Sequence, residues 1–524
     1  MNKYFIAVLI FLLHKTHSQD LYDNLEVEIR KNVNWYAGVL IEGHKMPLKN
    51  GYEAQLYGTS YYNQLQPLLL STSGELVWCE EPFRFRVNKE KIVFDRAYAP
   101  LVYKKAGKSL RDAYLYASKN YFPPSGKMPP ELFFSVPQYN TWIELTYNQN
   151  QKDILKYARS IIENGMPPGI IMIDDNWQED YGRWNFHPGR FPNPKAMMKE
   201  LKELGFKVML WVCPFVSADS DIYRELEKKR VFMLDETDKP AMVRWWNGVS
   251  AVLDLTNPES EKWFKEVLNN LITEFGIDGF KLDAGDGRFY KGIKSLKEVN
   301  PNTHTELFAK IGLSYPYNEY RATWKMGGQP LVQRLHDKSH DWKDLKKLIP
   351  HMLLEGIMGY PFSCPDMIGG GQFTSFLDDA PIDQELVVRS TQVHALMPMM
   401  QFSVAPWRIL DKKHFNAVLD AVNLRNKFKE TILTLAKKAS SNGEPVVRSM
   451  EYVYPHKGYV NINDQFMLGN KILVAPYLSK GEGSREVILP EGKWESDTGE
   501  IYKGGTSINV EVPLTRLPYF VNYK

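Results

Sequence analysis

The sequence of 524 residues contains only three cysteines, Cys79, Cys213 and Cys364. They allow one disulfide at most, and their spacing matches no metal-binding pattern. The sequence also lacks an Asn-x-Ser/Thr sequon, and the three glycines at 369–371 are not followed by the Lys-Ser/Thr of a phosphate loop. We therefore expect no metal ion and no cofactor, and a fold stabilised by packing.

Charge of one sign is not concentrated anywhere in the chain. The 65 lysines and arginines nearly balance the 62 acidic residues, for a net charge of +3, and the basic residues form no long runs. Proteins that bind nucleic acid or anionic membranes by charge usually carry such runs, so neither partner is expected. Aromatic residues are frequent at 13%. Such rings form platforms for sugar C–H faces, although a large core also uses them.

Long apolar runs are absent except at the N-terminus. A short basic start precedes residues 5–13 (FIAVLIFLL), and residues 16–18 (THS) offer a small-residue cleavage site. This pattern is typical of a signal peptide, and a spanning helix needs about 20 apolar residues. We predict a signal peptide at 1–18 and a secreted or lumenal protein (endoplasmic reticulum or lysosome) without a membrane span in the mature chain. An uncleaved anchor is the less favoured alternative.

Both ends of the remaining chain have the pattern of β-sandwiches. Within residues 19–130, short runs alternate between polar and apolar positions, as in 82–87 (PFRFRV) and 91–98 (KIVFDRAY), and helical periodicity is scarce. Residues 441–524 return to short strands with turn signals, for example at 507–514 (SINVEVPL). No low-complexity linker separates these units from the middle of the chain, so we expect them to pack together.

Between residues 131 and 440, strand-like apolar runs alternate with helical patterns. The expected strands are 132–136 (LFFSV), 169–173 (GIIMI), 207–212 (KVMLWV), 279–282 (GFKL) and 331–335 (LVQRL). Alternating βα units of this size indicate a parallel sheet with helical crossovers. A closed (β/α)8 TIM barrel fits the pattern better than an open sheet. The predicted fold class is thus α/β, a barrel flanked by N-terminal and C-terminal β-sandwich domains.

Carboxylates follow several of these expected strands. Asp174 and Asp175 follow the second, Asp283 follows the fourth, and Asp337 follows the fifth. The carboxyl ends of barrel strands form the active-site rim. Cleavage of a glycoside with retention needs two carboxyl groups about 5–5.5 Å apart. Asp283 and Asp337, at what we expect to be neighbouring strand ends, can meet that spacing.

The local sequence suggests a role for each carboxylate. Lys281 precedes Asp283 by two residues, so both side chains point to one face of a strand, and the ammonium favours the ionised form that a nucleophile needs. A structural Lys–Asp pair is the alternative. Asp337 is the candidate general acid/base, with a solvated loop carboxylate as the alternative. Of Asp174 and Asp175, only one should face the pocket, and we favour Asp174.

Specific segments of the barrel and of the C-terminal unit carry a resemblance. They are 241–248 (AMVRWWNG), 280–285 (FKLDAG), 359–370, 397–408 (MPMMQFSVAPWR), 464–469 (DQFMLG) and 473–476 (LVAP). Together they resemble glycoside hydrolase family 31, and within it the myogenesis-regulating glycosidase branch, an α-galactosidase-like group. The similarity extends from about residue 134 to the end of the chain.

The resemblance implies a retaining exo-α-glycosidase that acts by double displacement, with α-galactosides as the favoured substrates. It places the nucleophile on Asp283 and the acid/base on Asp337. It also places pocket carboxylates on Asp174 or Asp175 and on Asp366. The further sugar-binding residues that it implies are Arg244, Trp245, Lys281, Arg334 and Trp407.

One departure from the branch leaves the sugar open. Asp286 stands where the branch usually has glutamate, one methylene longer, which affects the expected sugar rather than the mechanism. An α-glucosidase or a sulfoquinovosidase of the same family is therefore the runner-up, and a non-catalytic glycan-binding protein is the alternative from another class. In each case the expected partner is an oligosaccharide or glycoconjugate. Homo-oligomerisation also remains open.

Overall fold

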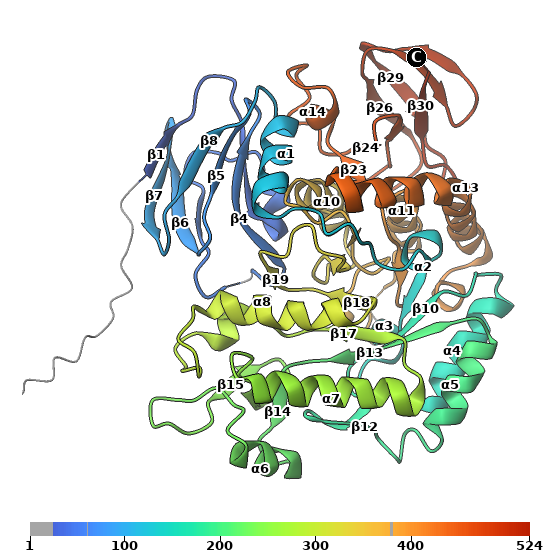
Figure 1. Cartoon of the computed structure of the whole chain (residues 1–524). Helices are drawn as coiled ribbons and strands as arrows, with labels where there is room; N and C mark the ends of the chain where they lie inside the picture. Colours follow the sequence, from blue (N-terminus) through green and yellow to red (C-terminus); the bar gives the residue numbers. More distant parts are fainter. Residues whose placement is uncertain (1–24, 60, 378–380, 524) are drawn as a thin grey trace, which may run out of the picture.

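The computed structural model describes residues 25–59, 61–377 and 381–523. The predicted signal peptide at 1–18 lies outside these residues. A central α/β body carries the N-terminal strands on one side and the C-terminal strands on another, both above the barrel in the view of Figure 1. In the described ranges, no helix is both long and apolar enough to cross a membrane.

Eight parallel strands form the central sheet and follow one another around it in chain order. A parallel bridge between Met367 and Gln401 joins the two ends of this sheet, which confirms the predicted barrel. The strands are β9 (Gln138–Asn140), β10 (Ile170–Ile173), β13 (Lys207–Val212), β17 (Gly279–Leu282), β18 (Tyr317–Tyr320), β20 (Gln333–Arg334), β21 (Ser363–Cys364) and β22 (Gln401–Phe402).

Helices between the strands cover the outside of the barrel (Figure 1). Asn193, Asn257 and Asn300 cap three of them, and each cap is followed by a proline whose missing N–H costs nothing at a helix start. The main helices are α4 (Gln151–Glu163), α5 (Pro194–Glu203), α7 (Pro258–Phe275), α8 (Pro301–Ile311), α10 (Leu348–Ile357), α11 (Gln384–Ala395) and α13 (Lys412–Asn442).

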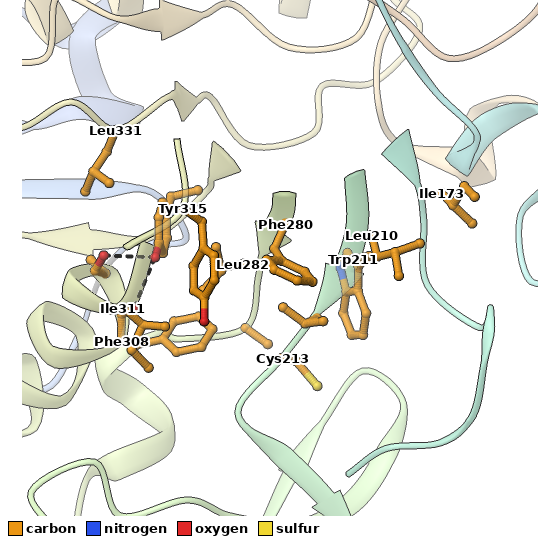
Figure 2. Packing of buried hydrophobic residues seen from close by; sticks show 14 of the residues in the cluster. Ile173, Leu210, Trp211, Cys213, Phe280, Leu282, Phe308, Ile311, Tyr315 and Leu331 are labelled. Atoms are coloured by element: carbon orange, nitrogen blue, oxygen red, sulfur yellow. Dashed lines mark hydrogen bonds between the residues drawn. The ribbon is translucent and has the colours of Figure 1, made fainter. Parts of the chain in front are cut away.

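The barrel strands are buried on both faces. Every residue of β10 and β17 is buried, as expected for parallel strands covered by helices. Figure 2 shows Leu210 and Trp211 of β13 beside Phe280 and Leu282 of β17 in this core. The three cysteines, one of which (Cys213) directly follows β13, are all free and buried.

The N-terminal unit consists of two antiparallel sheets that share one apolar core. A helix, α1 (Leu110–Tyr121), follows them, although the sequence showed little helical periodicity there. One sheet contains β1 (Leu25–Glu28), β7 (Lys91–Ala97), β6 (Phe83–Asn88) and β3 (Glu53–Gln55). The other contains β2 (Trp35–Val39), β4 (Gln64–Ser71), β5 (Glu75–Trp78) and β8 (Val102–Lys105), with β19 (Thr323–Trp324) from the barrel region at its edge.

The C-terminal unit also has two layers of strands around a core of its own. Its six-stranded sheet contains β23 (Val447–Arg448), β24 (Phe466–Leu468), β25 (Ile472–Val474), β30 (Tyr519–Tyr523), β27 (Lys493–Ser496) and β28 (Ile501–Lys503). The second layer pairs β26 (Ser484–Leu489) with β29 (Thr506–Glu511). The exact boundaries predicted at residues 130 and 440 remain predictions.

One expected barrel strand was wrong, and one barrel strand was not expected at all. Residues 132–136 form a helical turn, α2 (Leu132–Ser135), because a short apolar run fits a buried helix as well as a strand. The first strand is β9, which follows it. The sequence also gave no sign of β18, whose YNEY segment buries asparagine and glutamate. Because β18 lies between β17 and β20, Asp283 and Asp337 do not follow neighbouring strands.

Candidate active site

A cavity of about 450 Å³ opens at the carboxyl ends of the barrel strands. Residues from the ends of β10, β13, β17, β18 and β20 meet there with loop residues from other parts of the chain. Its lining combines carboxylates, cations and aromatic rings, namely Tyr62, Trp142, Tyr147, Asp174, Asp175, Trp211, Trp246, Lys281, Asp283, Arg288, Arg321, Arg334, His336, Asp337, Gln372 and Phe373.

Asp283 is a buried carboxylate with several donors. It accepts hydrogen bonds from Arg321 Nε at 2.9 Å, from Trp211 Nε1 at 3.1 Å and from the backbone N–H of Ala284 at 2.8 Å. Burial alone would raise the pKa of Asp283, but the charges of Arg321 and Lys281 and these hydrogen bonds hold it well below its usual value. The side chain is therefore ionised at the pH of any ordinary compartment, as a nucleophile requires.

Arg321 holds two carboxylates at once. Its Nη2 donates to Asp286 Oδ2 at 2.6 Å while its Nε donates to Asp283. The side chain of Asp286 is fully buried, and that of Arg321 is 8% exposed. A buried guanidinium with donors in a fixed plane orients both partners. Asp286, the position that departs from the branch, thus helps to position Arg321 against Asp283.

Lys281 pairs with Asp174 rather than with Asp283. Lys281 Nζ lies 2.7 Å from Asp174 Oδ2, and both side chains are buried. Lys281 still lines the cavity together with Asp283, as their spacing of two residues predicted. This pair places a fixed positive and a fixed negative group beside Asp283, where sugar hydroxyls can bind as both donors and acceptors.

Arg334 connects three further carboxylates. Its Nη1 lies 2.8 Å from Asp337 Oδ1 and 2.9 Å from Asp366 Oδ1, and its Nε lies 3.3 Å from Glu319 Oε1. Asp366 is buried and also accepts the backbone N–H of Lys338 at 2.7 Å. Asp337 is different, because its side chain is 33% exposed. It can therefore exchange protons with substrate and water, as an acid/base must.

Asp175 also lines the cavity, so both adjacent aspartates face it. The expectation that only one would do so was wrong, because β10 ends at Ile173 and the alternation of a strand no longer applies. Asp175 accepts hydrogen bonds from the Tyr181 hydroxyl at 3.1 Å and from Asn247 Nδ2. Burial, together with the negative charge of Asp174, raises the pKa of Asp175 to about 7.

The raised pKa of Asp175 predicts a pH-dependent stability. Since the folded state binds this proton more tightly than the unfolded chain, stability falls as pH rises between about 4 and 7, by up to about 4 kcal/mol. In Asp175→Asn, that component is removed, so the free energy of unfolding should fall less over this range. Urea unfolding at a series of pH values measures the difference. If the free energy of unfolding changes with pH in the same way for the wild type and the variant, the raised pKa of Asp175 would be contradicted.

Aromatic rings form much of the remaining wall. Trp211 lies at the end of β13 and donates to Asp283, whereas Trp246 is 45% exposed at the rim. Trp142 packs edge-on against Phe373 with ring centroids 5.4 Å apart. Tyr62 comes from the N-terminal unit and is 52% exposed. Such faces suit the apolar C–H faces of sugar rings.

Not every predicted sugar-binding residue reaches the cavity. Arg244 is exposed on β15 (Met242–Trp245) and does not line it. Trp245 does not line the cavity either. It is buried behind the lining residue Trp211, on which it stacks with ring centroids 6.5 Å apart. Trp407 stacks on Tyr157 at 5.8 Å, outside the lining. Asp366 contributes through Arg334 and not as a lining residue.

The sequence prediction missed Arg321, Trp211, Trp246 and Tyr62. Arg321 directly follows β18, so recognising that strand would have placed it at the rim. Trp211 lies in a strand that was predicted, but an apolar run gave no reason to single it out. Trp246 lies in the 241–248 segment that carries the resemblance, but only its neighbours Arg244 and Trp245 were given sugar-binding roles there. No local signal could have brought Tyr62 to the barrel, because its position depends on packing between units.

Two family models cover most of the chain. Residues 126–435 match the glycosyl hydrolases family 31 TIM-barrel domain, and residues 443–523 match the glycosyl hydrolase family 31 C-terminal domain. The myogenesis-regulating glycosidase of Mus musculus is 33% identical over 435 residues, which is 79% of this chain and 60% of that protein. The sulfoquinovosidase of Escherichia coli is 26% identical over 64% of this chain and 52% of that protein.

Solved structures agree on the fold. A Flavobacterium johnsoniae GH31 dextranase complexed with glucose superimposes with a TM-score of 0.84 at 21% identity, over 96% of this chain and 67% of that one. The chain spans about half to three fifths of the length of the curated relatives named above. The family matches, the barrel and the carboxylates at its strand ends together show that this chain belongs to glycoside hydrolase family 31.

Proposed function

We propose that the protein is a retaining exo-α-glycosidase with Asp283 as nucleophile and Asp337 as general acid/base. The observation that carries the proposal is the unequal environment of two carboxylates in one cavity. Asp283 is buried and held ionised by Arg321, whereas Asp337 is partly exposed. Carboxyl groups with different environments can divide the roles of nucleophile and acid.

In the first step, Asp283 attacks the anomeric carbon and the bond to the leaving oxygen breaks. Asp337 donates its proton to that oxygen, so the leaving group departs as a neutral alcohol and a glycosyl ester remains on Asp283. The Trp211 indole N–H and Arg321 both donate hydrogen bonds to Asp283 and so orient its carboxylate for the attack. The Asp174–Lys281 pair lies where it can bind hydroxyls of the same sugar.

In the second step, water attacks the anomeric carbon of the ester and Asp337 takes the proton of that water. Asp283 leaves as a carboxylate, and the sugar is released with its original anomeric configuration. The exposure of Asp337 supports this step, because water must reach it. The overall reaction consumes one water molecule for each glycosidic bond.

We favour a terminal α-galactose as the sugar. Support comes from the sequence segments shared with the myogenesis-regulating glycosidase branch and from the 33% identity to a member of it. A cavity, rather than an open groove, also suits a terminal sugar. We further propose that the protein is secreted or lumenal, as the apolar run at 5–13 suggests.

A sulfoquinovosidase is the second candidate, and one residue favours it. Arg288 lies at the rim with its guanidinium 4.2 Å from the centroid of the Tyr62 ring and 4.6 Å from that of Phe289. Within the described residues it forms no ion pair. An anionic sugar substituent could pair with it.

A panel of aryl α-glycosides tests the choice of sugar. We expect the wild type to cleave the galactoside at least about 10-fold faster than the glucoside, xyloside and sulfoquinovoside, measured as kcat/KM. Preference for the sulfoquinovoside, lost in Arg288→Gln, would replace galactose by the anionic sugar. A folded protein that cleaves no member would contradict the enzyme proposal and favour the glycan-binding alternative.

A further inference from the structure

A second and larger cavity, of about 760 Å³, lies where three parts of the chain meet. None of the described residues lines both this cavity and the one that holds Asp283. His44 comes from η1 (Leu40–Lys45) of the N-terminal unit. The barrel contributes residues from α9 (Trp342–Leu345) to the start of α10. The C-terminal unit contributes two residues that precede β24, four from the β25–β26 connection and one from β26. The lining residues are His44, Lys343, Lys346, Lys347, Pro350, Asn463, Asp464, Pro476, Tyr477, Leu478, Ser479 and Arg485.

The lining is strongly basic. It contains three lysines and one arginine but a single carboxylate, Asp464, which pairs with Arg485 at 3.1 Å. Lys347 pairs with Asp344, outside the lining, at 2.6 Å. In the part of the chain that the structure describes, Lys343 and Lys346 form no ion pair.

The charge of this cavity also acts on His44, which is one of its lining residues. His44 Nδ1 lies 2.8 Å from His351 Nε2. Burial lowers the pKa of His44, and the nearby charges of Lys347 and Lys45 lower it further, although Glu42 opposes them. The cavity therefore has a positive potential that an anion would offset.

Neutral groups make up the rest of the wall. Pro350, Pro476 and Leu478 are apolar, and Asn463 and Ser479 can donate and accept hydrogen bonds. Tyr477 offers a ring that already bears the Arg389 guanidinium 5.0 Å from its centroid. A small inorganic anion needs only the cations. Apolar patches, an aromatic ring and amide or hydroxyl groups in addition are the groups that bind sugar rings.

We propose that this cavity binds a sulfated oligosaccharide, at a site separate from the catalytic cavity. Sulfate groups on successive sugars are spaced single charges, and they match cations that come from two different units of the protein. Lysine binds such groups as a point charge without demanding a planar partner. The ligand would also bridge the barrel and the C-terminal unit.

Fluorescence polarisation with a labelled, fully sulfated heparin-derived hexasaccharide and the full-length protein tests the proposal. The test variant is Lys343→Glu/Lys346→Glu. The control variant is Lys262→Glu/Lys438→Glu, which changes the net charge equally at exposed positions outside the cavity, on α7 and α13. Thermal unfolding of both variants checks that they fold. We expect the cavity variant to raise Kd at least about 10-fold and the control less than about 2-fold.

Each other outcome overturns the proposal. An equal increase in Kd in both double variants would mean that binding of the hexasaccharide depends only on the overall charge of the protein. No binding to the wild type at low ionic strength would exclude the site. If the desulfated hexasaccharide binds as tightly, sulfate recognition is absent. If inorganic sulfate competes at a concentration close to the Kd of the hexasaccharide, the cavity binds a single anion and not an oligosaccharide.

Discussion

Replacement of Asp283 by asparagine is expected to lower kcat/KM for the preferred aryl α-glycoside by about 10⁴-fold or more, because the amide cannot form the glycosyl ester. The fold should remain, because Arg321 keeps its pair with Asp286 at 2.6 Å. Thermal unfolding of the variant checks this. Activity within 10-fold of the wild type would show that Asp283 is not the nucleophile.

The matched variant Asp337→Asn separates the two roles. It should slow the cleavage of substrates with poor leaving groups, which need protonation, by about 10²–10⁴-fold. For substrates with activated phenol leaving groups, the rate of the first step should fall much less, because such groups leave without protonation. If Asp283→Asn and Asp337→Asn respond identically to the leaving group, the assignment of separate roles fails.

Loss of Arg321 is expected to affect both activity and stability. Arg321→Met leaves Asp283 and Asp286 buried without their shared cation, which should cost about 3–5 kcal/mol in the free energy of unfolding. It also removes the main charge that keeps the pKa of Asp283 low. The carboxylate then ionises at higher pH, so the acidic limb of the kcat/KM profile should move to higher pH. At pH 5 we expect kcat/KM of Arg321→Met to be at least about 100-fold lower than that of the wild type.

A second variant separates positioning from stability. Arg321→Met/Asp286→Leu removes one of the two carboxylates that lost their shared cation, so it should recover part of the lost stability. It does not restore a cation to Asp283, so the shifted pH profile should persist. Recovery of the normal profile in the double variant would show that Arg321 acts only through stability. Arg321→Lys should move the profile less than Arg321→Met, because it keeps a positive charge.

The barrel was predictable where its strands are apolar. The GFKL and KVMLWV segments became β17 and β13 with the expected bounds, because strands covered on both faces select continuous apolar residues. The YNEY segment of β18 was missed because its asparagine and glutamate point into a polar network. Glu319 pairs with Arg334 and accepts a hydrogen bond from Gln401 at 2.7 Å. Only the tertiary structure supplies those partners.

The candidate site was partly predictable for the same reason. Asp283 follows a well-marked strand, so chain position alone brought it to the cavity with Lys281. The partner of Lys281 was not predictable, since Asp174 comes from another strand. Arg244 and Trp407 were placed by resemblance, and the structure sets them outside the lining. Of the residues placed by resemblance alone, Arg334 lines the cavity and Trp407 does not.

The anomeric configuration of the first sugar released tests the central claim most directly. Proton NMR, recorded within the first minutes of hydrolysis of the preferred aryl α-glycoside, distinguishes the α-anomer from the β-anomer before mutarotation mixes them. Double displacement through Asp283 predicts the α-anomer, which later equilibrates with the β-anomer. Initial release of the β-anomer would mean direct attack by water and would contradict the roles assigned to Asp283 and Asp337.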